Sequence, residues 1–202
     1  MTVALIFQLI VLIFSIMIHE IAHGAMALRL GDDTAQRLGR LTLNPLKHID
    51  PVGSIILPAI LLLFQSPFLI GWAKPVPYDP SRLRDPRTGA ALIALAGPAS
   101  NIVIAIFFGL LLRLAILPEA AATLVALIVY LNLLLAIFNL IPIPPLDGSK
   151  LFFYFLPQDY RLQATLETYG PFLLLVFILW GFNWLFPIIQ FLFQLIVGST
   201  VF

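Results

Sequence analysis

The sequence predicts an all-α polytopic membrane protein with about five to six transmembrane helices. Of its 202 residues, 61% are hydrophobic and only 10% are charged, whereas soluble domains have about 25% charged residues. Apolar runs long enough to cross a bilayer recur along the chain. A net charge of +1 offers nothing that would attract a nucleic acid. We expect one membrane-embedded domain, residues 1–202, with a core at about 3–150 and C-terminal helices at about 168–202.

The first apolar run, residues 3–30, predicts a helix long enough to span the membrane and to end at Gly31. It carries the pattern H-E-x-x-H, which is typical of zinc peptidases. His19 and His23 stand four residues apart, so a helix places both imidazoles on one face, where they can bind one metal ion. Glu20 lies beside them and can accept a proton from water that the metal activates.

The next part of the chain is less regular. Residues 32–50 are polar with a partial alternation of leucines, which favours a short β-hairpin or an extended loop near the site. Residues 52–72 are apolar but interrupted by Pro58 and Pro67, which predicts a broken or re-entrant segment. Residues 71–80 contain three prolines, cannot form regular helix, and are a candidate lid.

The rest of the chain contains four further apolar runs. Residues 88–112 and 120–140 are uninterrupted, and each predicts a spanning helix. After a semipolar connection, residues 170–186 predict another span. Residues 187–202 form a shorter run, which either crosses the membrane obliquely or lies in the interface.

The distribution of basic residues predicts the orientation. No Lys or Arg precedes Arg29, whereas the loop at 32–50 is basic, which places the N-terminus outside and this loop in the cytoplasm. The loop after residues 52–72 is basic as well, and a re-entrant segment keeps both loops on one side. The end of the run 120–140 then returns to the cytoplasmic side. This brings Asp147 to the depth of the two histidines.

A catalytic zinc site needs three protein ligands and one open position. The candidates for the third ligand are Asp147, His48, Asp50 and Glu167. Asp147 is favoured because it follows a true span and because the prolines at 142, 144 and 145 predict a rigid, extended strip that carries it. Gly148 would then allow a tight turn. A His/His/Asp set would also accept other divalent metals.

Two motifs together resemble the site-2 protease family of intramembrane zinc metalloproteases. They are residues 19–24, His-Glu-Ile-Ala-His-Gly, and residues 139–148, Asn-Leu-Ile-Pro-Ile-Pro-Pro-Leu-Asp-Gly. Residues 97–101, Gly-Pro-Ala-Ser-Asn, resemble the family element G-P-x-x-N/S. The resemblance covers about residues 14–150, in the compact prokaryotic form without PDZ or CBS domains. It implies one Zn²⁺ per chain held by His19, His23 and Asp147, with Glu20 as the base.

The same resemblance implies a transmembrane protein substrate, cut in or near its membrane span where the helix unwinds. Asn139 matches a family residue that hydrogen-bonds substrate backbone, and Asn101 is a second candidate substrate contact. The alternative for both is an interhelical hydrogen bond, and Asn132 is expected to serve packing. The resemblance also implies a prokaryotic cell membrane, with the active site toward the cytoplasm.

Two rival functions are open at this stage. A metal-binding or transport protein would place ligands along a path at several depths, whereas here the candidates share one level. An inactive scaffold would bind substrates without cutting them, and the intact Glu20 argues against it. For His48, a position beside the cleft competes with a plain interfacial histidine.

Overall fold

The computed structural model describes residues 2–56, 59–60, 63–64, 73–114, 117–157 and 159–198. Within this part the chain is helical, without strands, which confirms the predicted all-α fold. The main helices are α1 (Thr2–Arg29), α2 (Thr34–Arg37), α4 (Pro86–Arg113), α5 (Glu119–Asn139), α6 (Asp147–Phe155), α7 (Tyr160–Val176) and α8 (Leu185–Val197). Short helical turns are formed by Pro45–Lys47, Pro51–Ile56, Pro80–Arg82, Phe177–Gly181 and Phe182–Trp184.

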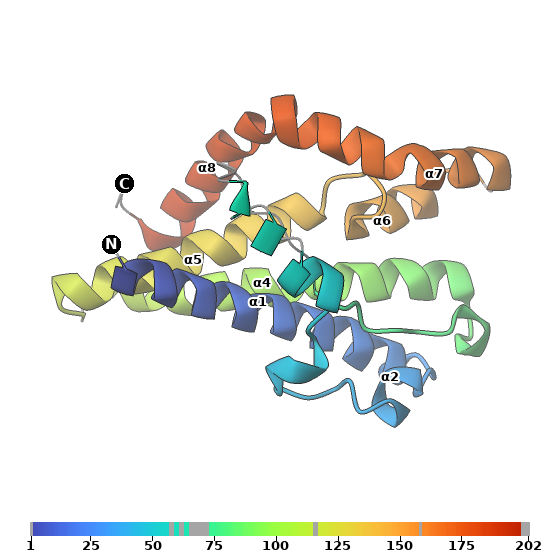
Figure 1. Cartoon of the computed structure of the whole chain (residues 1–202), viewed down its shortest axis with the longest axis horizontal. Coiled ribbons are helices and arrows are strands. Elements are labelled where there is room, and N and C mark those ends of the chain that lie inside the picture. The colour runs from blue at the N-terminus through green and yellow to red at the C-terminus, as the bar shows by residue number, and fades with distance from the viewer. Residues whose placement is uncertain are drawn as a thin grey trace.

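Three long helices form the centre of the molecule. α1, α4 and α5 lie side by side, and α4 runs antiparallel to the other two (Figure 1). α8 packs on α4 and α5 near one end of this layer, and α6 packs on α4 near the other. Small residues such as Ala105 on α4 and Ala126 on α5 are fully buried and let the helix backbones approach closely. The functional residues lie at the end where α6 joins the layer.

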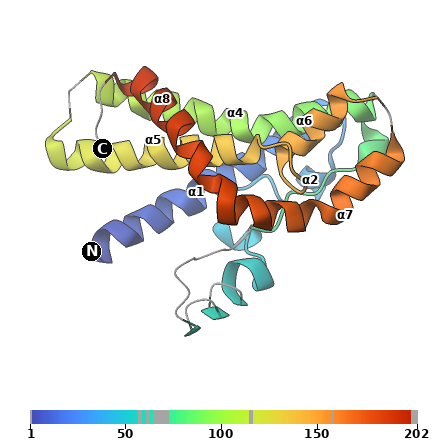
Figure 2. The same ribbon diagram turned by 90° about the horizontal axis from the view of Figure 1, so that it is seen from above.

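The surface is that of a membrane protein. The first half of α1 diverges from α4 and α5 (Figure 2), and its apolar side chains, such as Leu5 and Ile10, are about half exposed. Four helical stretches in the described residues are long and apolar enough to cross a membrane: Leu5–Arg29, Pro86–Arg113, Glu119–Asn139 and Tyr160–Val197. The chain is therefore an integral membrane protein, because lipid is the solvent that such a surface requires.

The ends of α1 and α4 follow from local sequence. Gly31 adopts a φ of 108°, a left-handed conformation that glycine tolerates best, and α1 stops just before it. α4 begins with Pro86, which has no N–H to leave unsatisfied at a helix start. Asp85 caps the same end by accepting from the backbone N–H groups of Arg87 and Thr88.

The prediction of five to six spans is not met in the described residues. The span expected at residues 170–186 and the shorter run after it, expected to cross obliquely or to lie in the interface, join in one helical stretch of 38 residues, Tyr160–Val197. The break expected at Pro187 appears instead just before it, as a π-helical turn and a 3₁₀ turn over residues 177–184, and the stretch bends there (Figure 1). A proline near the start of α8 cannot donate to the preceding turn, which favours such irregular geometry.

The β-hairpin expected within residues 32–50 is absent. Residues 34–37 form α2 instead, and Gly39 follows with a φ of 61°. Asp32 accepts from the backbone N–H and the hydroxyl of Thr34, which favours a helical start over an extended strand. The extended-loop alternative holds for the irregular residues after Gly39. Most of the broken segment 52–72 lies outside the described residues, so its re-entrant path stays a prediction.

Candidate active site

The two histidines of α1 meet the first residue of α6. The rings of His19 and His23 lie 4.6 Å apart between centroids, at an angle of 89°. The Nε2 atom of each lies 3.1 Å from the same oxygen, Oδ2 of Asp147. Residues 128 positions apart along the chain thus converge on one point.

The opposite nitrogen of each ring donates to an oxygen on α4. The Nδ1–H of His19 donates to Oδ1 of Asn101 at 2.7 Å, and that of His23 donates to the carbonyl oxygen of Ile93 at 2.6 Å. Both partners are acceptors, so in each neutral ring the proton sits on Nδ1 and the lone pair on Nε2. The lone pairs of the two Nε2 atoms and the carboxylate oxygen of Asp147 then face one another, and a cation between them would stabilise this arrangement. Ligand atoms around tetrahedral zinc lie about 3.3 Å apart, so this donor set fits a zinc ion.

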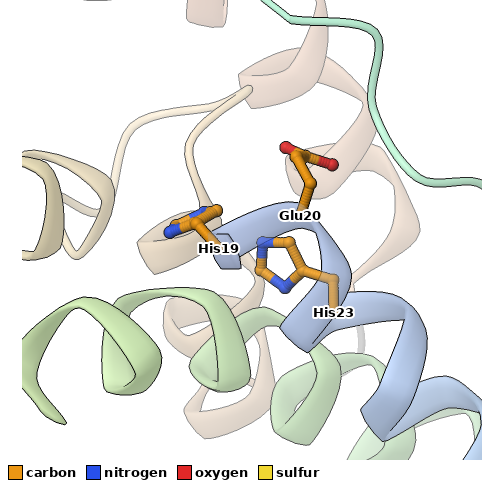
Figure 3. Close-up of side chains that lie close together, drawn as sticks. All are labelled: His19, Glu20 and His23. Atoms are coloured by element: carbon orange, nitrogen blue, oxygen red, sulfur yellow. The ribbon is translucent and has the colours of Figure 1, made fainter. Parts of the chain in front are cut away.

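Glu20 is turned away from the two imidazoles (Figure 3). Its Oε2 accepts a hydrogen bond from the backbone N–H of Val76 at 2.7 Å. The ligating atoms of Glu20 and both histidines lie within 4.8 Å of one another, but Asp147 is the carboxylate that contacts both rings. The carboxylate of Glu20 therefore lies beside the two histidines, while that of Asp147 lies between them.

Residues 73–79, here named the covering segment, pass beside Glu20 without regular structure. Arg40 holds the start of this segment. Its side chain is buried, and its guanidinium donates to the carbonyl oxygens of Lys47, Lys74 and Pro75. Because a guanidinium offers five donors in a fixed plane, one arginine can tie these carbonyl groups together.

Asp32 holds the far end of the covering segment. It is fully buried and accepts from the backbone N–H of Asp79 at 2.6 Å and from that of Thr34 at 3.0 Å. Burial raises the pKa of Asp32, but the hydrogen bonds from Thr34 and Asp79 outweigh it and hold the pKa below its usual range. The carboxylate is therefore ionised at neutral pH and fastens the segment to the end of α1.

Replacing Arg40 by Met is expected to destabilise the protein and free the covering segment. Methionine keeps an apolar stem but removes every donor, and hydrogen bonds to charged groups contribute about 1.5–3 kcal/mol each. The free energy of unfolding should fall by about 2 kcal/mol or more, and proteolysis within residues 73–79 should accelerate. Thermal unfolding and limited proteolysis of detergent-purified protein measure both effects.

The matched control is Arg37→Met, three residues away. Arg37 is 53% exposed and pairs with Asp33 at 2.8 Å within one helical turn. Exposed pairs of this kind contribute at most about 0.5 kcal/mol. If Arg37→Met and Arg40→Met behaved alike, the anchoring role of Arg40 would be wrong.

The site opens into a cavity of about 180 Å³. Glu20, Val76, Tyr78, Asn139 and Lys150 line it together with the two histidines and Asp147. A larger hollow of about 600 Å³, between α4, α6 and α7, shares Tyr78 and Lys150 with this cavity. The Nζ atom of Lys150 lies 5.2 Å from the centre of the Tyr78 ring, so this cation–π pair borders both spaces.

Two glycines make room for the site. A Cβ atom at Gly97 on α4 would lie 2.5 Å from Nε2 of His19 and 2.5 Å from Nε2 of His23, so only glycine leaves both rings in place. Gly148 lies against the carbonyl group of Leu140, which a Cβ would overlap. Glycine at position 148 therefore lets the start of α6 approach the backbone of Leu140 closely. The sequence suggested a tight turn as its role instead.

Several sequence-based expectations need correction. Asp147 is the first residue of α6, and the prolines lie in the irregular turns at residues 140–146, which separate the end of α5 from this helix. Asn101 is fully buried and donates to oxygens on α1 and α5, which favours the alternative of an interhelical hydrogen bond over a substrate contact. Asn139 does line the cavity, and its amide donates to the carbonyl of Leu135 within its own helix.

The other candidates for the third ligand are engaged elsewhere. His48 is buried and its Nε2 lies 2.9 Å from the carbonyl oxygen of Thr42. Asp50 accepts from the backbone N–H groups of Val52 and Gly53. Glu167 lies on α7 and accepts from Gln163 at 2.8 Å.

Sequence reasoning missed three contributors to the site. The backbone N–H of Val76 reaches Glu20 from the covering segment, and no sequence signal marks such a main-chain contact. Lys150 follows Asp147 by three residues on α6, so helical spacing already places both on one face. Ser15 precedes His19 by one helical turn, and its position on the same face was the available signal.

The chain is similar in sequence to several known proteins. Residues 115–180 match the family model "Peptidase family M50". YwhC of Bacillus subtilis, named "Putative zinc metalloprotease", is 39% identical over 180 residues, covering 84% of this chain and 78% of its own. Rip2 of Mycolicibacterium smegmatis, given the same description, is 32% identical over 170 residues, covering 83% and 64%. Rip2 of Mycobacterium tuberculosis H37Rv is 32% identical over 186 residues, covering 90% and 70%. No solved structure matches the chain.

The fold and the converging donor atoms define a membrane-embedded metalloprotease. The chain belongs to peptidase family M50, the site-2 protease family. Its cofactor is Zn²⁺ and its substrate is a protein.

Proposed function

We propose that the chain hydrolyses a peptide bond in or near the transmembrane segment of a membrane protein, with His19, His23 and Asp147 as the ligands of one zinc ion. The observation that carries the proposal is the approach of both Nε2 atoms to Oδ2 of Asp147 at 3.1 Å, beside a cavity that also contains the carboxylate of Glu20. When bound, zinc supplies a Lewis acid that polarises the scissile carbonyl group and acidifies water.

Glu20 is the general base of the proposed reaction. Its carboxylate takes a proton from the attacking water and delivers it to the nitrogen of the leaving amine. The N–H of Val76 holds Oε2 in place, while a carboxylate has further lone pairs available for the proton. The chain thus provides proton transfer at a defined atom, next to the position where the substrate carbonyl would lie.

Asn139 and the covering segment are proposed to hold the substrate backbone. Asn139, Val76 and Pro75 line the cavity and offer polar backbone or amide groups. A helix with its side chains is about 10 Å or more in diameter, which a space of about 180 Å³ cannot admit. The substrate therefore enters as an unwound stretch, and displacement of the covering segment would widen the entrance.

The proposal includes the orientation of the protein. The site is proposed to face the cytoplasm of a prokaryotic cell, within a single membrane domain of residues 1–202, and the basic loops at 32–50 and 74–87 support this orientation. Metal transport is less well supported, because the proposed ligands share one level rather than following a path. An inactive scaffold would not require Glu20 beside the metal position.

Removal and return of zinc test the proposal. Purified protein in liposomes is expected to cut at least one member of a panel of single-span membrane proteins, to lose this activity on treatment with a chelator, and to regain it with one zinc ion per chain. The measurement combines product analysis by mass spectrometry with metal analysis. Chelator-resistant cleavage, or well-folded protein that binds no zinc, would refute the proposal. Zinc binding without cleavage of any substrate would favour the scaffold.

A further inference from the structure

A cluster of buried polar side chains lies behind His19, on the side away from the cavity. Asn101 and Asn132 are fully buried and Ser15 is 4% exposed. These side chains belong to three different helices, α4, α5 and α1. Amides buried in a membrane protein cost free energy unless their donors and acceptors are paired, so their hydrogen bonds determine how each amide is oriented.

The orientation of each amide can be assigned by starting from one main-chain oxygen, the carbonyl of Ile128. Nδ2 of Asn132 donates to the carbonyl oxygen of Ile128 at 2.9 Å and to Oγ of Ser15 at 3.0 Å. A carbonyl oxygen accepts only, so the NH₂ group of Asn132 must face it. The amide oxygen of Asn132 therefore faces the other way, toward α4.

The next amide is oriented by the first. Nδ2 of Asn101 donates to Oδ1 of Asn132 at 2.9 Å and to the carbonyl oxygen of Ser15 at 3.3 Å. Its own Oδ1 is thus left to face Nδ1 of His19 at 2.7 Å. An acceptor at this short distance requires the proton of the neutral imidazole to be on Nδ1.

We propose that Asn132 and Asn101 act as a positioning relay that holds His19 with its proton on Nδ1 and the lone pair of Nε2 toward the metal position. The inference rests on the metal site of the proposed function. The carbonyl oxygen of Ile128 on α5 orients Asn132, Asn132 orients Asn101, and Asn101 orients the ring of His19 on α1. Neither asparagine touches the substrate or the metal. The relay acts through His19 alone.

The two histidines differ in how they are held. His23 donates to the main-chain oxygen of Ile93, which every residue at that position would supply. His19 depends on side chains, so its orientation can be changed by mutation. If the acceptor on Asn132 is removed, the amide of Asn101 keeps only its longer hydrogen bond to the carbonyl oxygen of Ser15, at 3.3 Å, and rotates more readily to present Nδ2–H to the ring. His19 would then carry its proton on Nε2, where no lone pair remains for a metal.

The test is the zinc affinity of purified, monodisperse protein in detergent, measured by competition with a chromophoric chelator. Groups that orient a metal-binding histidine typically change metal affinity by about 10- to 100-fold. We expect Asn101→Leu to weaken zinc binding by about this factor and Asn132→Leu, which does not touch His19, by about tenfold. Asn101→Asp retains an acceptor for His19 and, as the neutral acid that burial favours, an O–H donor toward Oδ1 of Asn132, so it is expected to recover most of the loss.

Ser100→Ala is the matched control. Ser100 is the neighbour of Asn101 on α4, but its hydroxyl donates to the carbonyl of Gly97 within its own helix. Its zinc affinity should stay within about twofold of wild type. If Asn101→Leu fails to fold, the comparison of Asn132→Leu with Ser100→Ala decides the same question.

Wild-type affinity in folded Asn132→Leu, or no recovery in Asn101→Asp relative to Asn101→Leu, would overturn the relay. A merely structural role would lower thermal stability without this pattern in zinc affinity. The readout is binding rather than cleavage. A chain that binds zinc but cuts nothing would therefore refute the proposed protease and leave the relay standing, whereas a wild type that binds no zinc would overturn both.

Discussion

Replacing Glu20 by Gln is expected to lower kcat by about 10²- to 10⁴-fold, the usual contribution of general acid–base catalysis, with one zinc ion still bound per chain. Glutamine has the same shape, and its Oε1 can still accept from the N–H of Val76, which lies 2.7 Å from the carboxylate in the native chain. The ligand atoms of His19, His23 and Asp147 are not altered. Only the ability to take up a proton is lost.

The measurement is cleavage of a single-span membrane protein in liposomes, with zinc per chain determined on the same preparation. Glu119→Gln is the control, because this exposed residue begins α5, at the opposite end of that helix from Asn139 and the site. Three outcomes separate the possible roles of Glu20. Lost activity with retained zinc identifies a base, loss of both identifies a metal ligand, and unchanged activity excludes Glu20 from the chemistry.

The parts of the site that sequence predicted are those set by local geometry. His19, Glu20 and His23 lie on one helix, and helical periodicity alone predicts that the two imidazoles lie on the same face of it. Asp147 was inferred from the distribution of basic residues and the return of a span to the same membrane side. The structure places Asp147 against both rings. It does so at the start of α6 rather than on an extended strip.

The parts that sequence could not predict depend on packing between helices. Asn101 is a candidate substrate contact by sequence, but it faces His19 and Asn132 because α4 packs against both α1 and α5 at this level. The β-hairpin expected within residues 32–50 does not form, because the side chain of Asp32 offers a local hydrogen-bond acceptor that favours α2. The two C-terminal runs are not separated at Pro187, because α7 continues into α8 through the irregular turns at residues 177–184, which precede that proline. None of these contacts leaves a periodic signal in the sequence.

Replacing Gly97 by Ala is expected to weaken zinc binding by at least about 100-fold and to abolish cleavage, while the protein still folds. The new methyl group would lie 2.5 Å from Nε2 of both His19 and His23, the atoms proposed to hold the metal. Neither ring can turn aside without breaking its bond to Asn101 or Ile93. Alanine favours a helix interior over glycine by about 1 kcal/mol, so α4 itself should not be weakened.

Gly89→Ala on the same helix separates this effect from a general loss of helix packing. A methyl group there meets the end of the flexible Leu83 side chain at 2.8 Å, which can move aside. Zinc affinity and thermal unfolding are measured for both variants in detergent. We expect Gly89→Ala to bind zinc as wild type does, and Gly97→Ala to remain folded without metal but to lose about 1–3 kcal/mol of stability, because the displaced rings give up a buried hydrogen bond. Wild-type zinc affinity in Gly97→Ala would mean that the metal does not bind between these rings, and the proposed ligand set would have to be abandoned.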